Sequence, residues 1–114
     1  VHSSTPYTDF FGRLCDVQPD GRSLNVCDGL LRLQPGTGET QSDGSVCIEV
    51  SLAATAYRFR TGHRLRLQVS SGAHPRVSRN LGTGEPVLTS TRMVPADQTI
   101  YHDAAHPSAL ILPL

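Results

Sequence analysis

Apolar and polar residues alternate without interruption over Arg64–Ser70, and this segment constrains the fold of the chain more than any other. Successive side chains of a β-strand point to opposite faces, so the pattern predicts a strand with one buried and one solvent-facing side. Val46–Leu52 repeats the alternation and predicts a second strand of the same kind. No apolar stripe of helical period extends over three turns in these 114 residues, so no substantial helix is expected.

Other segments are extended with less regular patterns. Asp9–Val17 is apolar on both faces, which indicates a strand that is covered on both sides. Leu24–Leu33 begins in alternation and loses it around Asp28 and Gly29, where a β-bulge would shift the phase. Four shorter segments are further strand candidates: Thr55–Phe59, Val87–Met93, Thr99–His102 and Ser108–Leu112.

Turn signals separate these segments. Pro19–Gly21 combines a proline that presets one turn angle with a glycine that tolerates positive φ. Pro35–Gly38 and Ser42–Gly44 bracket a loop that is longer than the usual hairpin connection. Several short strands with turns between them predict an all-β fold, a β-sandwich or jelly roll, formed as one domain over residues 1–114.

The charge pattern argues against several kinds of partner. Ten acidic residues balance ten basic ones, all of them arginine, and the sequence has no basic patch of the kind that binds nucleic acid or an acidic membrane surface. No apolar run reaches the length of about 20 residues that a membrane span needs. We therefore expect neither a nucleic-acid partner nor a membrane partner.

The three cysteines, Cys15, Cys27 and Cys47, are odd in number and lack the spacing of a zinc site. Cys15 and Cys27 could meet across a hairpin, but reduced thiols on small strand residues are the better prediction. No signal peptide is recognisable. The localisation is left open by these features, with a cytoplasmic one weakly favoured.

The sequence contains no recognisable constellation of catalytic or metal-binding residues. A serine nucleophile on an α/β-hydrolase elbow needs the pattern GxSxG, and the nearest segment, Gly21–Asn25, lacks the second glycine. His102 and Asp103 would point to opposite faces of a strand. Pro107, directly after His106, argues against the helix that would align these ligands. The expectation is a chain without a catalytic residue, cofactor or metal of its own.

The stretch His74–Glu85, HPRVSRNLGTGE, is the most unusual in the chain. Arginine forks and an asparagine amide can fix an irregular loop by bonding backbone carbonyls and carboxylates. One hypothesis is therefore a self-structured loop. The other is a loop that docks against another domain or borders its pocket, with four candidate interdomain residues: His74, Arg76, Arg79 and Asn80.

Several segments resemble one known family. Pro6–Arg32, PYTDFFGRLCDVQPDGRSLNVCDGLLR, is similar to the C-terminal domain of the X-prolyl dipeptidyl-peptidase and cocaine-esterase superfamily, which also includes α-amino-acid ester hydrolases and glutaryl acylases. The likeness continues through Tyr57–Arg76, YRFRTGHRLRLQVSSGAHPR, and Arg79–Glu85, RNLGTGE. It ends with Ala96–Leu114, ADQTIYHDAAHPSALILPL, so nearly the whole chain is covered in matching order.

The resemblance implies a jelly-roll domain with a galactose-binding-like fold that follows an α/β-hydrolase domain with a helical cap. In the family, a serine–histidine–aspartate triad in the hydrolase domain forms an acyl-enzyme from an ester or amide. No triad position maps onto this sequence, and none of its histidines is carried over as the catalytic base. The family's jelly roll is about twice as long, and Val1–Ser4 would align within an early strand rather than at its start, so we expect the opening strands to be missing.

Three functional hypotheses follow. The first is a non-catalytic C-terminal domain of a serine hydrolase of the X-Pro dipeptidyl-peptidase or acyl-esterase type, which packs on the α/β-hydrolase domain, stabilises it and helps to shape its acyl pocket. The alternative is an independent carbohydrate- or ligand-binding β-sandwich module, against which the lack of tryptophan weighs. The third is a small structural protein. A sandwich without its opening strands exposes unpaired edges, so self-association is also expected.

Overall fold

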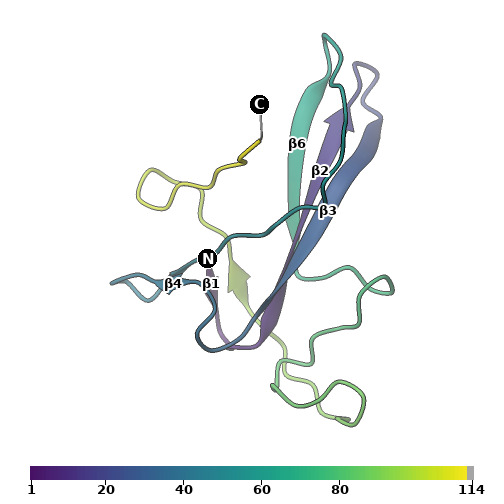
Figure 1. The fold of residues 1–114 in the computed structure, drawn as a ribbon. Coiled ribbons are helices and arrows are strands. Elements are labelled where there is room, and N and C mark those ends of the chain that lie inside the picture. Colours follow the sequence, from purple (N-terminus) through teal and green to yellow (C-terminus); the bar gives the residue numbers. More distant parts are fainter. Residues whose placement is uncertain (113–114) are drawn as a thin grey trace.

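The computed structural model describes residues 1–112, and these form an all-β, antiparallel structure without a helix. Its main element is a three-stranded sheet in the order β3–β2–β6 (Figure 1). The strands are β2 (Thr8–Val17), β3 (Ser23–Leu33) and β6 (Arg64–Ser70). The expected all-β class is confirmed and is consistent with the predicted β-sandwich, whereas the jelly-roll order of strands stays a prediction. No helix that could span a bilayer occurs among residues 1–112.

Two small sheets flank the main one. Each consists of two antiparallel strands of two residues. The pairs are β1 (His2–Ser3) with β7 (Gln98–Thr99), and β4 (Glu39–Thr40) with β5 (Val46–Cys47). The first pair joins the N-terminal residues to the segment around residue 98, and Ser4 N also donates to Asp97 O at 2.9 Å.

Strand β2 forms the core of the molecule. Every residue of β2 except Arg13 is buried, on both faces of the sheet. Phe10 is 1% exposed and Val17 is 2% exposed. The prediction of a strand that is covered on both sides is therefore confirmed. Burial of these side chains is the main apolar contribution to folding, at roughly 1.5–3 kcal/mol for each large aliphatic or aromatic side chain.

Strand β3 contains the β-bulge that its sequence pattern predicts. The register shifts where Leu14 faces Cys27 and the next residue, Cys15, faces Asn25, so Val26 is the extra residue. The bulge thus lies shortly before the predicted site at Asp28 and Gly29. Gly29 has a different requirement: a Cβ at this position would overlap the carbonyl oxygen of Ser51, which crosses the strand closely.

The predicted strand Val46–Leu52 is wrong over most of its length, since only Val46–Cys47 pairs, as β5. The residues that follow lie against the main sheet without joining it. A Cβ added to Gly12 would meet the side chains of Leu52 and Val50 at 3.4 and 3.7 Å. The alternation here therefore reflects apolar side chains that pack on a sheet, and an extended segment can do this without strand pairing.

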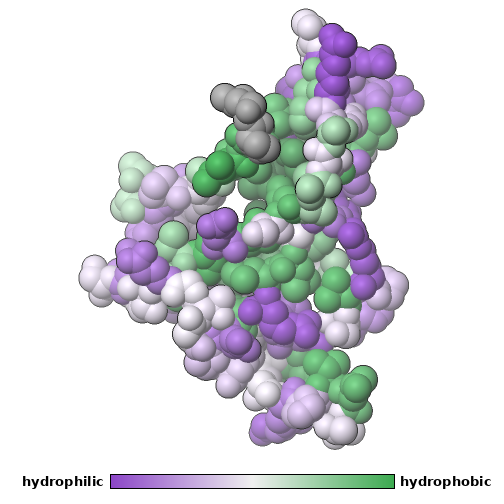
Figure 2. All heavy atoms as spheres, in the orientation of Figure 1, coloured by the Kyte–Doolittle hydropathy of each residue, from purple (hydrophilic) through white to green (hydrophobic). Residues whose placement is uncertain are grey.

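Strand β6 has the predicted bounds, Arg64–Ser70, but the prediction of one buried side is wrong. All seven of its residues are exposed. Leu65, Leu67 and Val69, which we call the apolar row, are 52%, 43% and 42% exposed. The physical reason is that β6 is an edge strand: it pairs with β2 only, and no other described strand covers it. Figure 2 accordingly shows apolar surface in the upper half of the molecule, where this sheet lies.

The remaining strand candidates do not form strands. Thr55–Phe59 and Val87–Met93 have no paired neighbour, and residues 86–90 are held by turn bonds from Thr89 N and Ser90 N to Pro86 O. Only Thr99 of Thr99–His102 belongs to a strand, and Ser108–Leu112 contains none. An extended propensity becomes a strand only where a partner backbone is available, which these segments lack within residues 1–112.

Candidate functional site

The register of the sheet separates an apolar face from a charged face. Residues that lie directly opposite each other in antiparallel strands project to the same side. Phe10, Leu14 and Leu67 thus share the apolar face with their cross-strand neighbours. The charged face carries these ionisable side chains of the three strands: Asp9, Arg13, Asp28, Arg32, Arg64 and Arg66.

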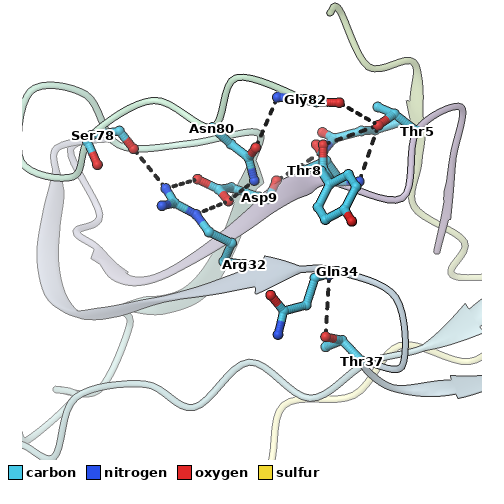
Figure 3. Close-up of polar contacts among 11 residues, drawn as sticks. Thr5, Thr8, Asp9, Arg32, Gln34, Thr37, Ser78, Asn80 and Gly82 are labelled. Carbon is cyan, nitrogen blue, oxygen red and sulfur yellow. Dashed lines mark hydrogen bonds and ion pairs between the residues drawn. The ribbon is translucent and has the colours of Figure 1, made fainter. Parts of the chain in front are cut away.

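A cluster around Asp9 fixes one end of the charged face. The Asp9 side chain is 2% exposed and accepts two hydrogen bonds from Arg32, from Nε and NH2, both at 2.9 Å. Asn80 Nδ2 donates to the same carboxylate at 2.8 Å (Figure 3). Arg32 NH2 also donates to the Ser78 carbonyl at 2.9 Å. The buried charge of Asp9 is thereby paired and hydrogen-bonded, as a buried charge must be.

The same cluster determines the shape of the 78–82 segment. Asn80 Oδ1 accepts a hydrogen bond from Gly82 N at 3.0 Å, and Thr5 Oγ1 donates to Gly82 O at 3.1 Å (Figure 3). Gly82 has a φ of 74° and lies against Val94, so a side chain there would be both strained and obstructed. Asn80 is therefore a structural tether, which matches the hypothesis of a self-structured loop.

A second cluster lies at Asp28, further along the charged face. Arg13 NH2 and Arg76 NH1 lie 3.1 and 2.6 Å from the same oxygen, Asp28 Oδ2. The side chains of Asp28 and Arg13 are 10% and 28% exposed, while that of Arg76 is 64% exposed. Arg13 also stacks over the ring of Phe11, with Cζ 5.0 Å from its centroid. One carboxylate here serves two guanidinium groups.

These two arginines border an open groove of about 610 Å³, which we call the arginine groove. Strand β6 forms one wall and residues 72–76 form the other. A smaller groove of about 350 Å³ lies on the other side of Arg13 and Arg76, next to Asp28. The side chains that determine the chemistry of the larger, arginine groove are Phe11, Arg13, Gln68, His74 and Arg76.

The four candidate interdomain residues are thus divided by the structure. His74 and Arg76 come together in the arginine groove, and both are exposed. Asn80 is half-buried in the Asp9 cluster. Arg79 is exposed and forms no hydrogen bond or ion pair with another residue of the described part of the chain. Their role toward another domain stays a prediction.

A third cluster holds residues 57–63 against the end of β2. Asp16 is 2% exposed, and it accepts a hydrogen bond from the Tyr57 hydroxyl at 2.8 Å. His63 Nδ1 lies 2.8 Å from Asp16 Oδ1. Burial raises the pKa of Asp16, but the hydrogen bonds from His63 and Tyr57 lower it by more, so the carboxylate stays ionised. Within residues 1–112 no serine hydroxyl bonds to His63, and the pair serves as a tether.

His106 joins its own loop, which contains Asp103, to the loop between β4 and β5, which contains Asp43. Its Nε2 lies 2.8 Å from Asp43 Oδ2, and its Nδ1 lies 3.2 Å from Asp103 Oδ1. The Asp43 carboxylate, with Asp103, raises the pKa of His106 above its ordinary value. Among residues 1–112, no three His, Cys, Asp or Glu side chains are placed to hold a metal ion.

Asp9, Asp16 and Asp28 organise the three clusters, and none of them was predicted to do so from the sequence. A signal for two of them was available, because Asp9 and Asp16 bound a strand that is otherwise apolar on both faces. An acidic residue in such a strand needs a partner when it is buried. The partner's identity could not be predicted, since Asn80 lies 71 residues from Asp9 and His63 lies 47 residues from Asp16.

The fold and the clusters define an antiparallel all-β domain whose buried charges are paired with one another. The sequence matches the family described as the X-Pro dipeptidyl-peptidase C-terminal non-catalytic domain over residues 1–111. The chain belongs to this family, as the resemblance in its sequence implied. It is also 36% identical over 121 residues to the cocaine esterase of Rhodococcus sp. (strain MB1 Bresler). The match covers 100% of this chain but 21% of the esterase, so the chain spans about a fifth of that relative.

Proposed function

We propose that this chain is the non-catalytic domain of a serine hydrolase of the X-Pro dipeptidyl-peptidase or acyl-esterase type. It packs on an α/β-hydrolase domain, stabilises that domain and helps to shape its acyl pocket. The family membership supports the non-catalytic role. The relative supports the larger context, because the matched region makes up only 21% of a protein named as an esterase.

The observation that carries this proposal is the exposure of β6. Its three apolar side chains are each more than 40% exposed, although they lie on a strand that is fully paired along its other edge. Exposed apolar rows next to an open strand edge mark interaction surfaces. The same strand supplies Gln68 and Ser70 to the arginine groove on the opposite face of the sheet, so a partner at the open edge of β6 can contact both the apolar row and the groove.

The acyl-pocket part of the proposal concerns residues 72–76. This segment follows β6 directly, forms a wall of the arginine groove and exposes His74 and Arg76 to solvent. A loop at the margin of a docking surface can reach over a neighbouring site while the strand behind it stays packed. We therefore assign this loop, rather than the 78–82 segment that Asn80 holds to the sheet, to the border of the pocket.

Removal of the domain tests the proposal. The full-length hydrolase and a version without residues 1–114 are heated, and the residual hydrolysis of a p-nitrophenyl ester is measured. We expect the shortened enzyme to lose activity at a temperature at least about 4 °C lower, which corresponds to a loss of roughly 1–2 kcal/mol for a domain of ordinary size. Equal inactivation temperatures would contradict the stabilising role.

Exposure of the isolated chain to a fluorophosphonate tests the non-catalytic part. Such a probe labels serines that a neighbouring base activates. Intact-mass spectrometry should show an unmodified chain, with the full-length hydrolase as the positive control. One stoichiometric adduct on the isolated chain would place a nucleophile within it and would contradict the proposal.

A further inference from the structure

The two arginines of the arginine groove carry more positive charge than the one carboxylate beside them, Asp28, can neutralise. Arg13 and Arg76 both contact Oδ2 of Asp28, and this carboxylate is the acidic partner that they share. A single negative charge between two guanidinium groups leaves one positive charge over. Arg76 is 64% exposed at its side chain, so this excess charge is available at the surface.

The rest of the charged face adds to this excess. Arg64 and Arg66 of β6 project to the same side as Arg13, and neither forms an ion pair with a described residue. Arg32 is already neutralised by Asp9. Five arginines (Arg13, Arg32, Arg64, Arg66 and Arg76) thus stand against two aspartates on this face. The whole chain has no net charge, so the imbalance is local.

The guanidinium of Arg13 is held rigidly beside the groove. Arg13 Nε is enclosed and has no hydrogen-bond partner among the described residues. The stacking of the guanidinium on Phe11 and its contact with Asp28 fix its plane. A guanidinium has five N–H donors in a rigid fork that matches the two oxygens of a carboxylate. A second carboxylate would meet the exposed guanidinium of Arg76 at the surface of the groove, whereas the enclosed Nε of Arg13 is out of its reach.

We propose that the arginine groove binds an acidic side chain, Asp or Glu, on a segment of the hydrolase domain. This inference rests on the proposed function and names the chemistry of the surface that meets this domain. A protein segment fits better than a free small carboxylate, because the groove is open and Arg66 and Arg64 project from the same face of β6 beyond the residues that line the groove. An acidic segment can contact the paired and the unpaired arginines together, and the apolar row lies on the other face of the same strand.

A titration of the isolated chain tests the charge preference directly. The probes are hexaglutamate, hexaglutamine and glutarate, added at low ionic strength and followed by backbone amide NMR. Hexaglutamate should shift the amides of Arg13, Gln68 and Arg76, and the other two probes should bind at least tenfold more weakly. Equal binding of hexaglutamine would overturn the proposal, and equal binding of glutarate would show a small-molecule site instead of a docking surface.

Two matched variants locate the site. Arg76→Gln removes a groove arginine whose side chain is 64% exposed, and Arg92→Gln removes an arginine that is 69% exposed and paired with Glu85 outside the groove. Each variant removes one exposed arginine from an ion pair, and Asp28 keeps Arg13 as a partner, so we expect small effects on folding from both. Arg76→Gln should weaken hexaglutamate binding about tenfold, and Arg92→Gln should leave it unchanged. Equal affinities of the two variants would overturn the proposal.

The same variants in the full-length hydrolase separate this inference from the proposed function. At low salt, Arg76→Gln should lower the temperature of thermal inactivation relative to Arg92→Gln, and the difference should vanish at 1 M salt, where the Debye length falls to about 3 Å. If removal of the domain destabilises the hydrolase but the two variants behave alike, the docking stands and the acidic contact is wrong. If removal has no effect, both proposals fall.

Discussion

At the scale of single residues, Asp9 and Asp16 are each only 2% exposed, and each joins segments that are distant in the sequence. Asp9 holds Arg32 of β3 and Asn80 of the loop after β6, whereas Asp16 holds Tyr57 and His63. A buried carboxylate is costly unless its oxygens accept hydrogen bonds, and both aspartates satisfy this condition. These clusters therefore position the loops on the sheet, in a molecule whose apolar core is centred on one strand.

Replacement of Asp9 by alanine should lower the free energy of unfolding by about 2–3 kcal/mol, because hydrogen bonds to a charged group each contribute about 1.5–3 kcal/mol and Arg32 can partly rehydrate. Urea denaturation followed by circular dichroism measures the change. Asp20→Ala is the control, since Asp20 lies in an exposed turn and pairs only with Arg22. Equal stabilities of the two variants would show that the Asp9 cluster does not hold the loop.

His106 should make the contact between residues 43 and 106 pH-dependent. Its pKa is raised in the folded chain, so the contribution of its charged form is complete below the unfolded value of about 6.5 and is lost as the pH rises through the folded pKa. NMR titration of the His106 ring should give a pKa above that unfolded value. Asp43→Asn should lower this pKa and Asp20→Asn should not. An unchanged pKa in Asp43→Asn would contradict the contact.

The sequence predicted part of this residue-scale picture. The cysteines are free thiols in the structure, as expected from their odd number. The loop partners of Asp9 and Asp16 could not be predicted, because side chains 41 to 71 residues apart meet only after the sheet has formed.

At the scale of elements, the sequence patterns correctly predicted β2, β3 and β6. These three strands pair along nearly their whole length, so their apolar patterns correspond to real strands. Periodicity failed for Val46–Leu52, where the side chains alternate but the backbone pairs only over Val46–Cys47. It also failed for the burial of β6. Alternation shows which side of a strand is apolar, but whether that side is covered depends on a neighbour that the strand's own sequence does not specify.

The exposed edge of β6 should cause the isolated chain to self-associate. In an antiparallel pair of two β6 strands centred on Leu67, apolar residues face apolar residues and Arg66 faces Gln68. Leu67→Glu places like charges opposite each other and should weaken the association by about tenfold or more. Sedimentation velocity over a range of concentrations measures this. Leu88→Glu, at a side chain that is 97% exposed in a turn, is the control.

A wild-type chain that is monodisperse and monomeric at every concentration, and that unfolds in one cooperative transition, would contradict this prediction. Such a result would mean that the exposure of the apolar row is tolerated without a partner. A Leu88→Glu effect equal to that of Leu67→Glu would instead indicate association through general surface hydrophobicity.

At the scale of the whole molecule, one strand carries most of the buried apolar side chains, and a second strand exposes its apolar row. The all-β class and the family were accessible from the sequence, through strand and turn patterns and through motifs in matching order. The arrangement of exposed surface was not accessible, because it depends on which strands find neighbours. This distribution of burial agrees with a domain that completes its contacts on a larger protein.

Hydrogen exchange of the β6 amides tests this central claim most directly. Exchange is compared between the isolated chain and the full-length hydrolase by mass spectrometry, with the exposed turn at residues 41–44 as the internal control. If β6 docks on the hydrolase domain, residues 64–70 should exchange at least tenfold more slowly in the full-length protein, while the control turn is unchanged. Equal exchange of residues 64–70 in both proteins would contradict the proposal that this surface is the interface.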